Sequence, residues 1–195
     1  PYVIPPLENT TTAPKFKSMA LSGNRMWGTN DPNAKYKVSF SGTAAYMAIF
    51  SDFYGGGWIN LENGGREQPT AVLHYQSAAG VGTATVLCRT PEGKGAVWQI
   101  SISTATVGTT VFAIPSAIKV VGSFGTDAIL GVVPTSNDIL FPNKRGIFSL
   151  GPEKNYYNVL RTNELSVRIR PYIQSLTGSL TSGICAYFYD AKVFF

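Results

Sequence analysis

The sequence predicts an all-β protein, an antiparallel sandwich or barrel, and three observations carry this prediction. About ten short runs rich in β-branched and aromatic residues recur along the chain, separated by Gly, Pro, Asn and Ser. No apolar pattern of helical period lasts longer than about three turns, which excludes α/β architectures. No internal repeat is present, which argues against a propeller or a β-helix. At 195 residues the chain is long enough for one well-buried domain.

The N-terminal region differs in composition from the rest of the chain. We expect residues 1–35 to form an extended arm and residues 36–195 to form a single β-sandwich domain. The opening PYVIPPLENTTTAP has four prolines and a run of threonines, which excludes a helix. Trp27 stands among the turn residues that follow, so we expect the arm to dock at one point. The chain begins at Pro1 without a methionine, and we expect a processed product or the ordered part of something longer.

The first half of the domain holds four strand-like runs and one ambiguous segment. KYKVSF, residues 35–40, alternates, with Val38 and Phe40 on one face. TAAYMAIFSDF, residues 43–53, fits either a strand or one short helix. Three further runs are strand-like, at residues 70–77, 83–88 and 96–103. RTPEGKG lies between the last two, where Pro presets a bend and Gly supplies a positive φ, so these two runs are expected to form a hairpin.

The second half continues with short runs that end at Pro or Gly. Four of them are expected to be strands, at residues 109–115, 117–124, 128–134 and 146–150. LSVRIR, residues 165–170, has the clearest alternation in the sequence and predicts a strand. The C-terminal GICAYFYDAKVFF is apolar almost throughout, which predicts a strand covered on both faces.

The chain has few charges for a soluble domain. Charged residues make up 14% of the sequence, against roughly 25% in an ordinary domain. This favours burial in a protein assembly, with a secreted binding surface rich in Ser, Thr, Asn and Gly as the alternative. The net charge is +5, but no run of four or more Lys or Arg occurs. The basic residues are expected to be scattered and solvated, and a weak surface for a polyanion is the alternative.

Residues for nucleophilic or metal chemistry are scarce. His74 is the single histidine, and it is expected to be structural. Cys88 and Cys185 lie far apart in apolar contexts and are expected to be buried thiols, with one disulfide as the alternative. These residues cannot assemble a zinc site. No stretch approaches the roughly 20 apolar residues of a membrane span.

The carboxylates offer one enzymatic alternative. A glycosidase needs two facing carboxylates, and a sandwich could present Asp52 with Glu62 or Glu67 in this way. Nothing in the sequence singles out such a pair, so we expect solvated loop acids. The prediction is that the protein is not an enzyme and has no catalytic residues, cofactor or metal.

Three glycines stand between two large rings in SDFYGGGWINLE. A phosphate-binding loop would continue with Lys and Ser or Thr and open a helix, whereas Trp58 opens an alternating strand here. We therefore predict that Gly55, Gly56 and Gly57 form a tight bend or bulge. Tyr54 and Trp58 are expected to pack beside it.

Aromatic residues support a second class of function, a carbohydrate- or receptor-binding module of lectin-like or phage or toxin type. Three tryptophans, Trp27, Trp58 and Trp98, could stack on sugars or could belong to the core. Tyr-rich loops could contribute in the same way, with Tyr156, Tyr157 and Tyr172 as their members.

One segment resembles a known family. The apolar AAYMAIFSDF, the step from Phe53 to Gly55 and the alternating WINLE are together similar to the region before the third strand in jelly-roll coat proteins of picorna-like icosahedral viruses. The segment covers roughly residues 43–62, and Gly56 and Gly57 stand where the family has basic residues.

The resemblance implies an eight-stranded jelly roll in a virion capsid that assembles in the host cytoplasm. Its implied partners are other copies and sister coat proteins, with a host receptor as a further partner. It also implies an N-terminal arm inside the shell, above genomic RNA that Lys15, Lys17 or Arg25 would touch loosely.

Overall fold

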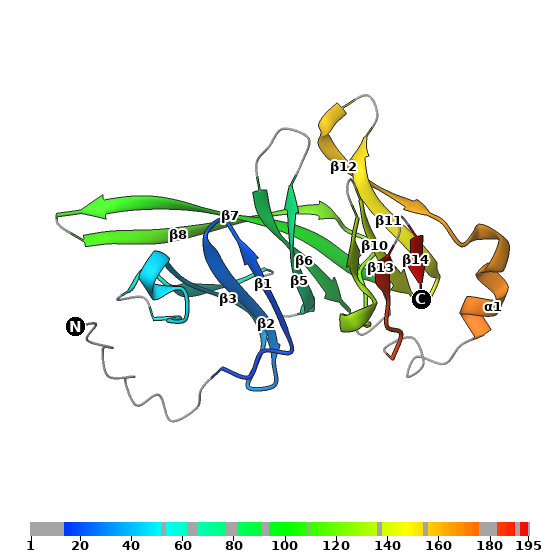
Figure 1. Ribbon diagram of the computed structural model, residues 1–195, viewed down its shortest axis with the longest axis horizontal. Coiled ribbons are helices and arrows are strands. Elements are labelled where there is room, and N and C mark those ends of the chain that lie inside the picture. The colour runs from blue at the N-terminus through cyan, green and yellow to red at the C-terminus, as the bar shows by residue number, and fades with distance from the viewer. Residues whose placement is uncertain are drawn as a thin grey trace.

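A computed structural model of the chain describes residues 14–51, 54–61, 66–76, 82–90, 94–108, 110–135, 138–153, 156–175, 183–189 and 192–194 (Figure 1). The all-β prediction is confirmed. Within these residues, antiparallel strands form three four-stranded sheets and one two-stranded sheet.

Each four-stranded sheet is made from consecutive strands. The first sheet has the order β1 (Ser18–Ser22), β2 (Arg25–Asp31), β3 (Ala34–Thr43) and β4 (Gly57–Asn60). The second, here called the middle sheet, has the order β5 (Gln68–Gln76), β6 (Gly82–Arg89), β7 (Gly95–Val107) and β8 (Thr110–Val121). The third sheet has the order β12 (Tyr156–Glu164), β11 (Gly146–Glu153), β10 (Ile139–Asn143) and β9 (Val133–Pro134). The two-stranded sheet pairs β13 (Tyr187–Tyr189) with β14 (Lys192–Phe194).

The jelly-roll arrangement is not confirmed. A jelly roll is built from Greek keys, whose long connections place strands side by side that are not consecutive in the chain. In all described sheets the hydrogen-bonded neighbours follow one another in the sequence. The pattern is that of three antiparallel meanders.

The middle sheet is covered on both faces, and this explains its sequence. On one face Val72, Val86 and Ile100 join Trp27 and Phe40 of the first sheet in one core. Side chains from the opposite face join the third sheet in a second core, and they include Leu73, Leu87, Val97, Phe141 and Phe148. Strands buried on both faces lose the usual polar alternation, so residues 70–75 are apolar at most positions.

The prediction of an arm over residues 1–35 is wrong for residues 18–31. Here β1 and β2 form a hairpin in the first sheet, and Trp27 lies in the core with its indole N–H donating to the Ser22 carbonyl at 2.9 Å. The short apolar strand β1 pairs with β2 despite the many turn residues around it. Residues 1–13 lie outside the described residues.

Residues 165–170 do not form the strand that their alternation predicts. A 3-10 turn (Val167–Ile169) leads directly into the helix α1 (Arg170–Ser175). Pro171 favours this outcome, because proline suits the first turn of a helix and cannot donate to a ladder. Arg170 also forms a two-pronged ion pair with Glu164 at 2.6–2.8 Å, which ties the helix to the end of β12.

Three more sequence predictions need correction. Residues 128–134 form a 3-10 turn (Ile129–Gly131) and the two-residue strand β9 rather than one strand. The C-terminal segment is not one strand covered on both faces but the β13–β14 hairpin, whose Tyr187 and Tyr189 are exposed. Residues 109–115 and 117–124 are not separate strands either, since β8 runs through Pro115. Proline is tolerated there because β8 is the last strand of its sheet. In the ambiguous segment 43–53, residues Ala44–Tyr46 form a 3-10 turn.

Candidate interaction surfaces

Gly55 and Gly56 lie in a tight turn, and Gly57 is the first residue of β4. Gly55 has a φ of +74°, a conformation that glycine adopts without strain. A Cβ on Gly56 would lie 2.9 Å from the Phe50 carbonyl carbon and 3.0 Å from the Phe40 oxygen, so the backbones leave no space for a side chain. The Gly56 N–H donates to the Ser51 carbonyl at 2.9 Å, which closes the turn.

Arg25 supports this turn and does not face a ligand. Its side chain is buried, and its Nη1 donates to the carbonyl of Ser41 at 2.6 Å and to that of Gly55. The guanidinium carbon also lies 5.7 Å from the centre of the Phe40 ring. This buried position does not favour the expected contact of Arg25 with RNA, because its Nη1 donates to the backbone around the bend.

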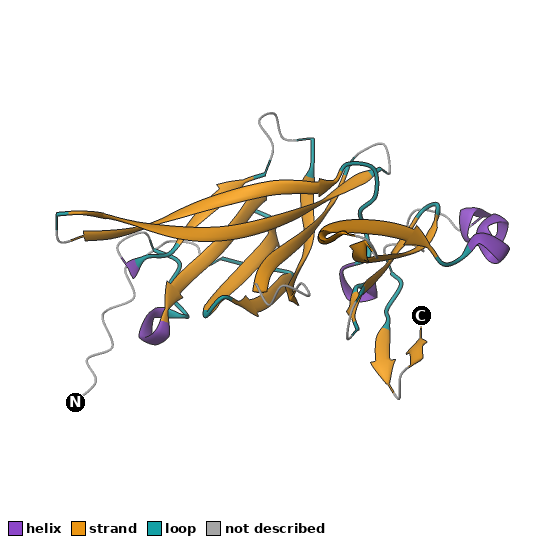
Figure 2. Ribbon diagram, turned by 90° about the horizontal axis from the view of Figure 1, so that it is seen from above, coloured by secondary structure: helices purple, strands orange, loops and turns teal. Residues whose placement is uncertain are grey.

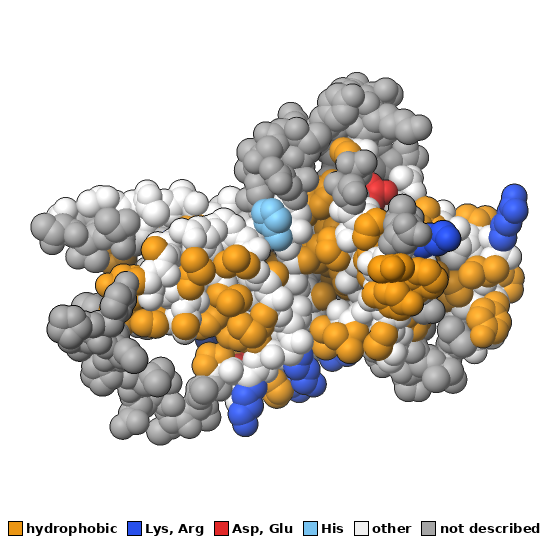
Figure 3. Space-filling model, in the orientation of Figure 1, with side chains coloured by type: hydrophobic (Ala, Val, Ile, Leu, Met, Phe, Trp, Pro, Cys, Tyr) orange, Lys and Arg blue, Asp and Glu red, His pale blue; other side chains and the backbone are white. Residues whose placement is uncertain are grey.

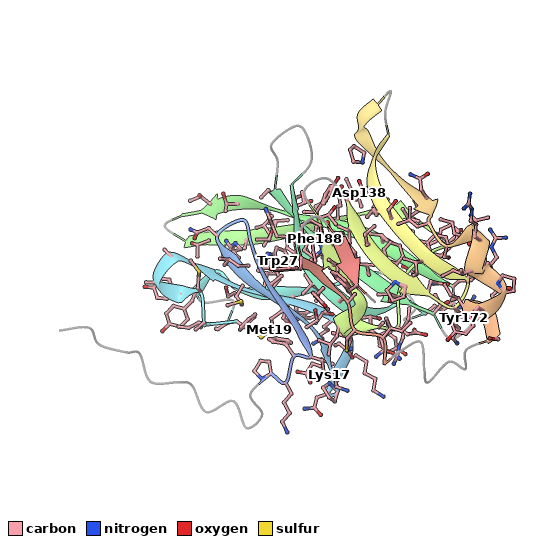
Figure 4. The ribbon with its side chains drawn as sticks, turned by 45° about the vertical axis from the view of Figure 1, so that its right-hand side comes forward. Lys17, Met19, Trp27, Asp138, Tyr172 and Phe188 are labelled. Atoms are coloured by element: carbon pink, nitrogen blue, oxygen red, sulfur yellow. The ribbon has the colours of Figure 1, made fainter. Side chains whose placement is uncertain are left out.

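Lys15 and Lys17 remain exposed at one side of the first sheet. Between them Phe16 packs over Gly28, whose missing side chain leaves room for the ring, and lies 5.0 Å from the ring of Phe50. This contact anchors residues 14–17 on the outer face of the sheet. Lys17 lies at the periphery in Figure 4, where its ammonium group is open to solvent.

The three tryptophans have different environments. Trp27 lies inside the core between the first and middle sheets (Figure 4). Trp98 is partly buried, and its indole N–H donates to Glu67 Oε2 at 2.6 Å. Trp58 is 50% exposed, and the Lys37 ammonium lies 3.9 Å from its ring centre. Only the last of these rings is therefore open to a ligand.

The ring pair predicted beside the glycines is also only partly packed. Tyr54 stacks on Tyr46 with 5.0 Å between ring centres, whereas Trp58 projects outward. Tyr172 is 68% exposed on α1. The side chains of Tyr156 and Tyr157 lie outside the described residues.

Of the three carboxylates nominated for catalysis, only Glu67 lies in the described residues. Glu67 is buried in an ion pair with Lys119, at 2.6 Å, and this ammonium also lies 4.9 Å from the Trp98 ring. Asp52 and Glu62, its suggested partners, lie outside the described residues. The geometry thus makes Glu67 a structural link between the start of β5 and the edge strand β8.

His74 and the cysteines also have local structural surroundings. Nδ1 of His74 lies 2.8 Å from the Ser22 hydroxyl, which is buried, so the pair joins β5 to β1. Both cysteines are thiols, with Cys88 buried as expected and Cys185 exposed, contrary to expectation. Among the described residues, no cluster of three His, Cys, Asp or Glu could hold a metal ion. No helix in the described part of the chain is long and apolar enough to cross a membrane.

Exposed apolar side chains are the most prominent feature of the surface. Among the described residues, seventeen large hydrophobic side chains are each at least 41% exposed. Most of them belong to four groups on different elements. These groups are Met19 and Leu21 on β1; Phe112, Ile114 and Ile118 on β8; Leu165, Val167, Ile169 and Tyr172 around α1; and Tyr187, Phe188, Tyr189 and Phe194 on the C-terminal hairpin.

The groups are spread along the molecule. In Figure 3, hydrophobic side chains appear over the first sheet and over β13 and β14, with further apolar patches between them and toward α1. The α1 group lies at the far end of the molecule from the β7–β8 hairpin (Figure 1). Exposed apolar side chains therefore lie toward both ends of the molecule and between them.

A groove lies between the edge strands β1 and β5. It has a volume of about 490 Å³, with Met19, Leu21 and Leu73 in its walls and Pro134 at its border. The strands on its two sides are not paired as a ladder. They are joined through side chains, by the His74–Ser22 contact and by a bond from the Val72 N–H to the Ser18 hydroxyl at 3.0 Å.

Comparison of the chain with protein-family models, with curated proteins and with solved structures finds no match.

Proposed function

We propose that this chain is a structural subunit of an icosahedral viral capsid, assembling with its own copies and with sister coat proteins around an RNA genome in the host cytoplasm. The observation that carries the proposal is the division of the exposed apolar surface into four groups on different elements. A subunit of a closed shell contacts several neighbours at once and needs an apolar patch toward each of them. A protein with one ligand would gather its apolar surface at one place.

The composition supports the same role. At 14% charged residues, the chain has little means of solvating its whole surface, and assembly would cover the uncharged parts. The exposed Lys15 and Lys17 supply the positive charge that a loose contact with RNA requires. The proposal rests on this surface and not on a jelly-roll strand order.

The alternative, a carbohydrate- or receptor-binding module, has weaker support. Sugar sites commonly use open aromatic rings, and among the tryptophans only Trp58 is open, with Lys37 already over its ring. As a capsid subunit the protein could still meet a host receptor through such a surface.

Electron microscopy and size-exclusion chromatography with light scattering of the purified chain test the proposal. We expect assembly that increases with protein concentration and persists at high salt, because the contacts are mainly apolar. Particles or ring-shaped oligomers should appear in the micrographs, alone or with sister coat proteins. A monomer that stays monodisperse at high concentration in both settings would refute the proposal.

A further inference from the structure

The β7–β8 hairpin projects beyond the rest of the molecule. Both strands reach past β1 and β2 toward one end of the protein (Figures 1 and 2). Residues 95–118, most of this hairpin, contain no Asp, Glu, Lys, Arg or His. Its exposed apolar side chains, Phe112, Ile114 and Ile118, are costly to keep in water.

The two faces of the hairpin carry different residues. On the inner face Ile100, Ile102, Ala113 and Ala117 pack against the core shared with the first sheet. The outer face points away from that core. At the base of the hairpin Val121 packs against the core with the third sheet, whereas neither core formed by the described residues includes Phe112, Ile114 or Ile118.

The outer face consists of a ridge and a furrow. The ridge is formed by Phe112, Ile114 and Ile118, which are 48%, 47% and 65% exposed. Across the ladder each large residue faces a smaller or polar one. The pairs are Ala105 with Phe112, Ser103 with Ile114, and Gln99 with Ile118, and Ser101 faces Ser116 in the gap between them. The smaller residues on β7, Ser101, Ser103 and Ala105, form the furrow.

Edge-to-edge pairing of this strand is disfavoured. Pro115 lies in the middle of β8, opposite Ile102, and has no N–H to offer a strand laid along the free edge. Proline at such a position is a common device against edge association. The face of the hairpin, rather than its edge, is therefore available for contact.

We propose that the outer face of the β7–β8 hairpin binds the same face of a second copy of this chain across a two-fold axis, with the ridge of each copy in the furrow of the other. A two-fold contact requires a self-complementary surface, and a ridge beside a parallel furrow has this property. Packed sheets lie about 10 Å apart, which allows side chains of this size to interdigitate.

The charge distribution also favours a second copy as the partner. Each chain has a net charge of +5, so two copies repel one another wherever basic residues meet. The hairpin has no charged residue between positions 95 and 118, so this contact adds no local repulsion. The inference rests on the proposed function as a shell subunit and assigns one of its subunit contacts.

The test exchanges one ridge residue, Ile114, with the furrow residue that it faces across the β7–β8 ladder, Ser103. Ser103→Ile places a large residue in the furrow, and Ile114→Ser leaves a gap in the ridge. Each single variant should weaken dimerisation of the full chain by at least about tenfold, measured by analytical ultracentrifugation. The double variant has the composition of the natural chain and again presents a ridge facing a furrow, so its dimerisation should return to within about threefold of the natural chain.

Leu130→Ser is the matched control, since Leu130 is 67% exposed on a different element. It removes a comparable apolar side chain, and dimerisation should not change. Circular dichroism of each variant checks that the fold is intact. Single variants that dimerise like the natural chain, or a double variant as weak as the singles, would overturn the proposed interface.

These results are distinguishable from failure of the proposed function. If the natural chain forms particles and the hairpin variants form them equally well, the interface is wrong and the capsid role stands. If the hairpin variants abolish a dimer but no particles form with sister proteins, the interface stands and the capsid role is wrong.

Discussion

A single methyl group at Gly56 should destabilise the fold measurably. The added Cβ in Gly56→Ala would lie 2.9 Å from the Phe50 carbonyl carbon and 3.0 Å from each of the Ile49 and Phe40 oxygens. All three neighbours are backbone atoms, which cannot rotate away as a flexible side chain can. Relief of the clash would therefore move the chain that leads into β4, and with it the Gly55 carbonyl that accepts from Arg25.

The size of the effect follows from two opposing contributions. Overpacking a tight site costs about 1–3 kcal/mol, and backbone contacts place Gly56 toward the upper end of that range. Replacing glycine also restricts the unfolded chain, which returns about 0.4–1 kcal/mol to the folded state. The expected net loss is about 2 kcal/mol in the free energy of unfolding. With a urea dependence of about 1–3 kcal/mol per molar, the midpoint should fall by roughly 1 M.

Urea unfolding followed by tryptophan fluorescence measures this loss, and other glycines serve as controls. Gly122→Ala makes the same chemical change where the nearest atom is the end of the Lys119 chain at 3.9 Å, so it should be neutral or slightly stabilising. Gly108→Ala adds a methyl group to open space at a φ of +63°. Its cost, about 1–2 kcal/mol, should therefore come from the left-handed backbone conformation alone. A Gly56→Ala midpoint equal to that of Gly122→Ala would refute the steric explanation.

Three further outcomes are expected. Arg25→Leu should destabilise the fold by about 2 kcal/mol or more in urea unfolding, because the Ser41 and Gly55 carbonyls lose a charged donor, and an unchanged midpoint would contradict this role. Burial raises the pKa of Asp138, so its contribution to stability is present at acid pH and is lost as the pH rises through that raised pKa. Asp138→Asn should therefore gain stability relative to the natural chain as the pH rises from acid to neutral. Thermal unfolding of both proteins across this pH range measures the difference, and parallel stability curves would exclude this role of Asp138. The double variant Lys15→Glu, Lys17→Glu should weaken RNA binding uniformly across RNA sequences. In filter-binding titrations, the slope of the binding constant against salt concentration should fall by about two phosphate contacts.

The strands that the sequence predicts well are those whose partners are close in the chain. Residues 83–88 and 96–103 lie in β6 and β7, which pair antiparallel as predicted, while the predicted turn at residues 91–93 lies outside the described residues. Val38 and Phe40 face the core as their alternation predicts. In these cases local propensity and tertiary packing agree, so the local pattern is sufficient.

The errors arise where local pattern and tertiary context differ. Residues 165–170 alternate, but Pro171 and the Glu164–Arg170 ion pair favour a helical turn. No local pattern predicts the hairpin of β1 and β2, because turn residues surround a five-residue strand and its stability depends on Trp27 entering a core formed by residues distant in the sequence. Alternation shows which residues share a face only if the segment is a strand at all.

The low charge favours burial in an assembly, which stays a prediction. No sequence pattern distinguishes an apolar residue in the core from one on the surface. Arg25 illustrates the same limit among basic residues. It is one of three nominated for RNA, and only its position under the Ser41 and Gly55 carbonyls gives it a structural role.

In the β8 strand, the structure shows which apolar residues are covered and which are exposed. Its inner face, which packs against the first sheet, has the small residues Ala113 and Ala117. Its outer face has the larger Phe112, Ile114 and Ile118, all of which are exposed. Ordinary burial would place the larger apolar side chains on the covered face, since the stabilisation grows with the apolar area removed from water. The reversed order is explained if the outer face is also a core, with the missing half supplied by another subunit.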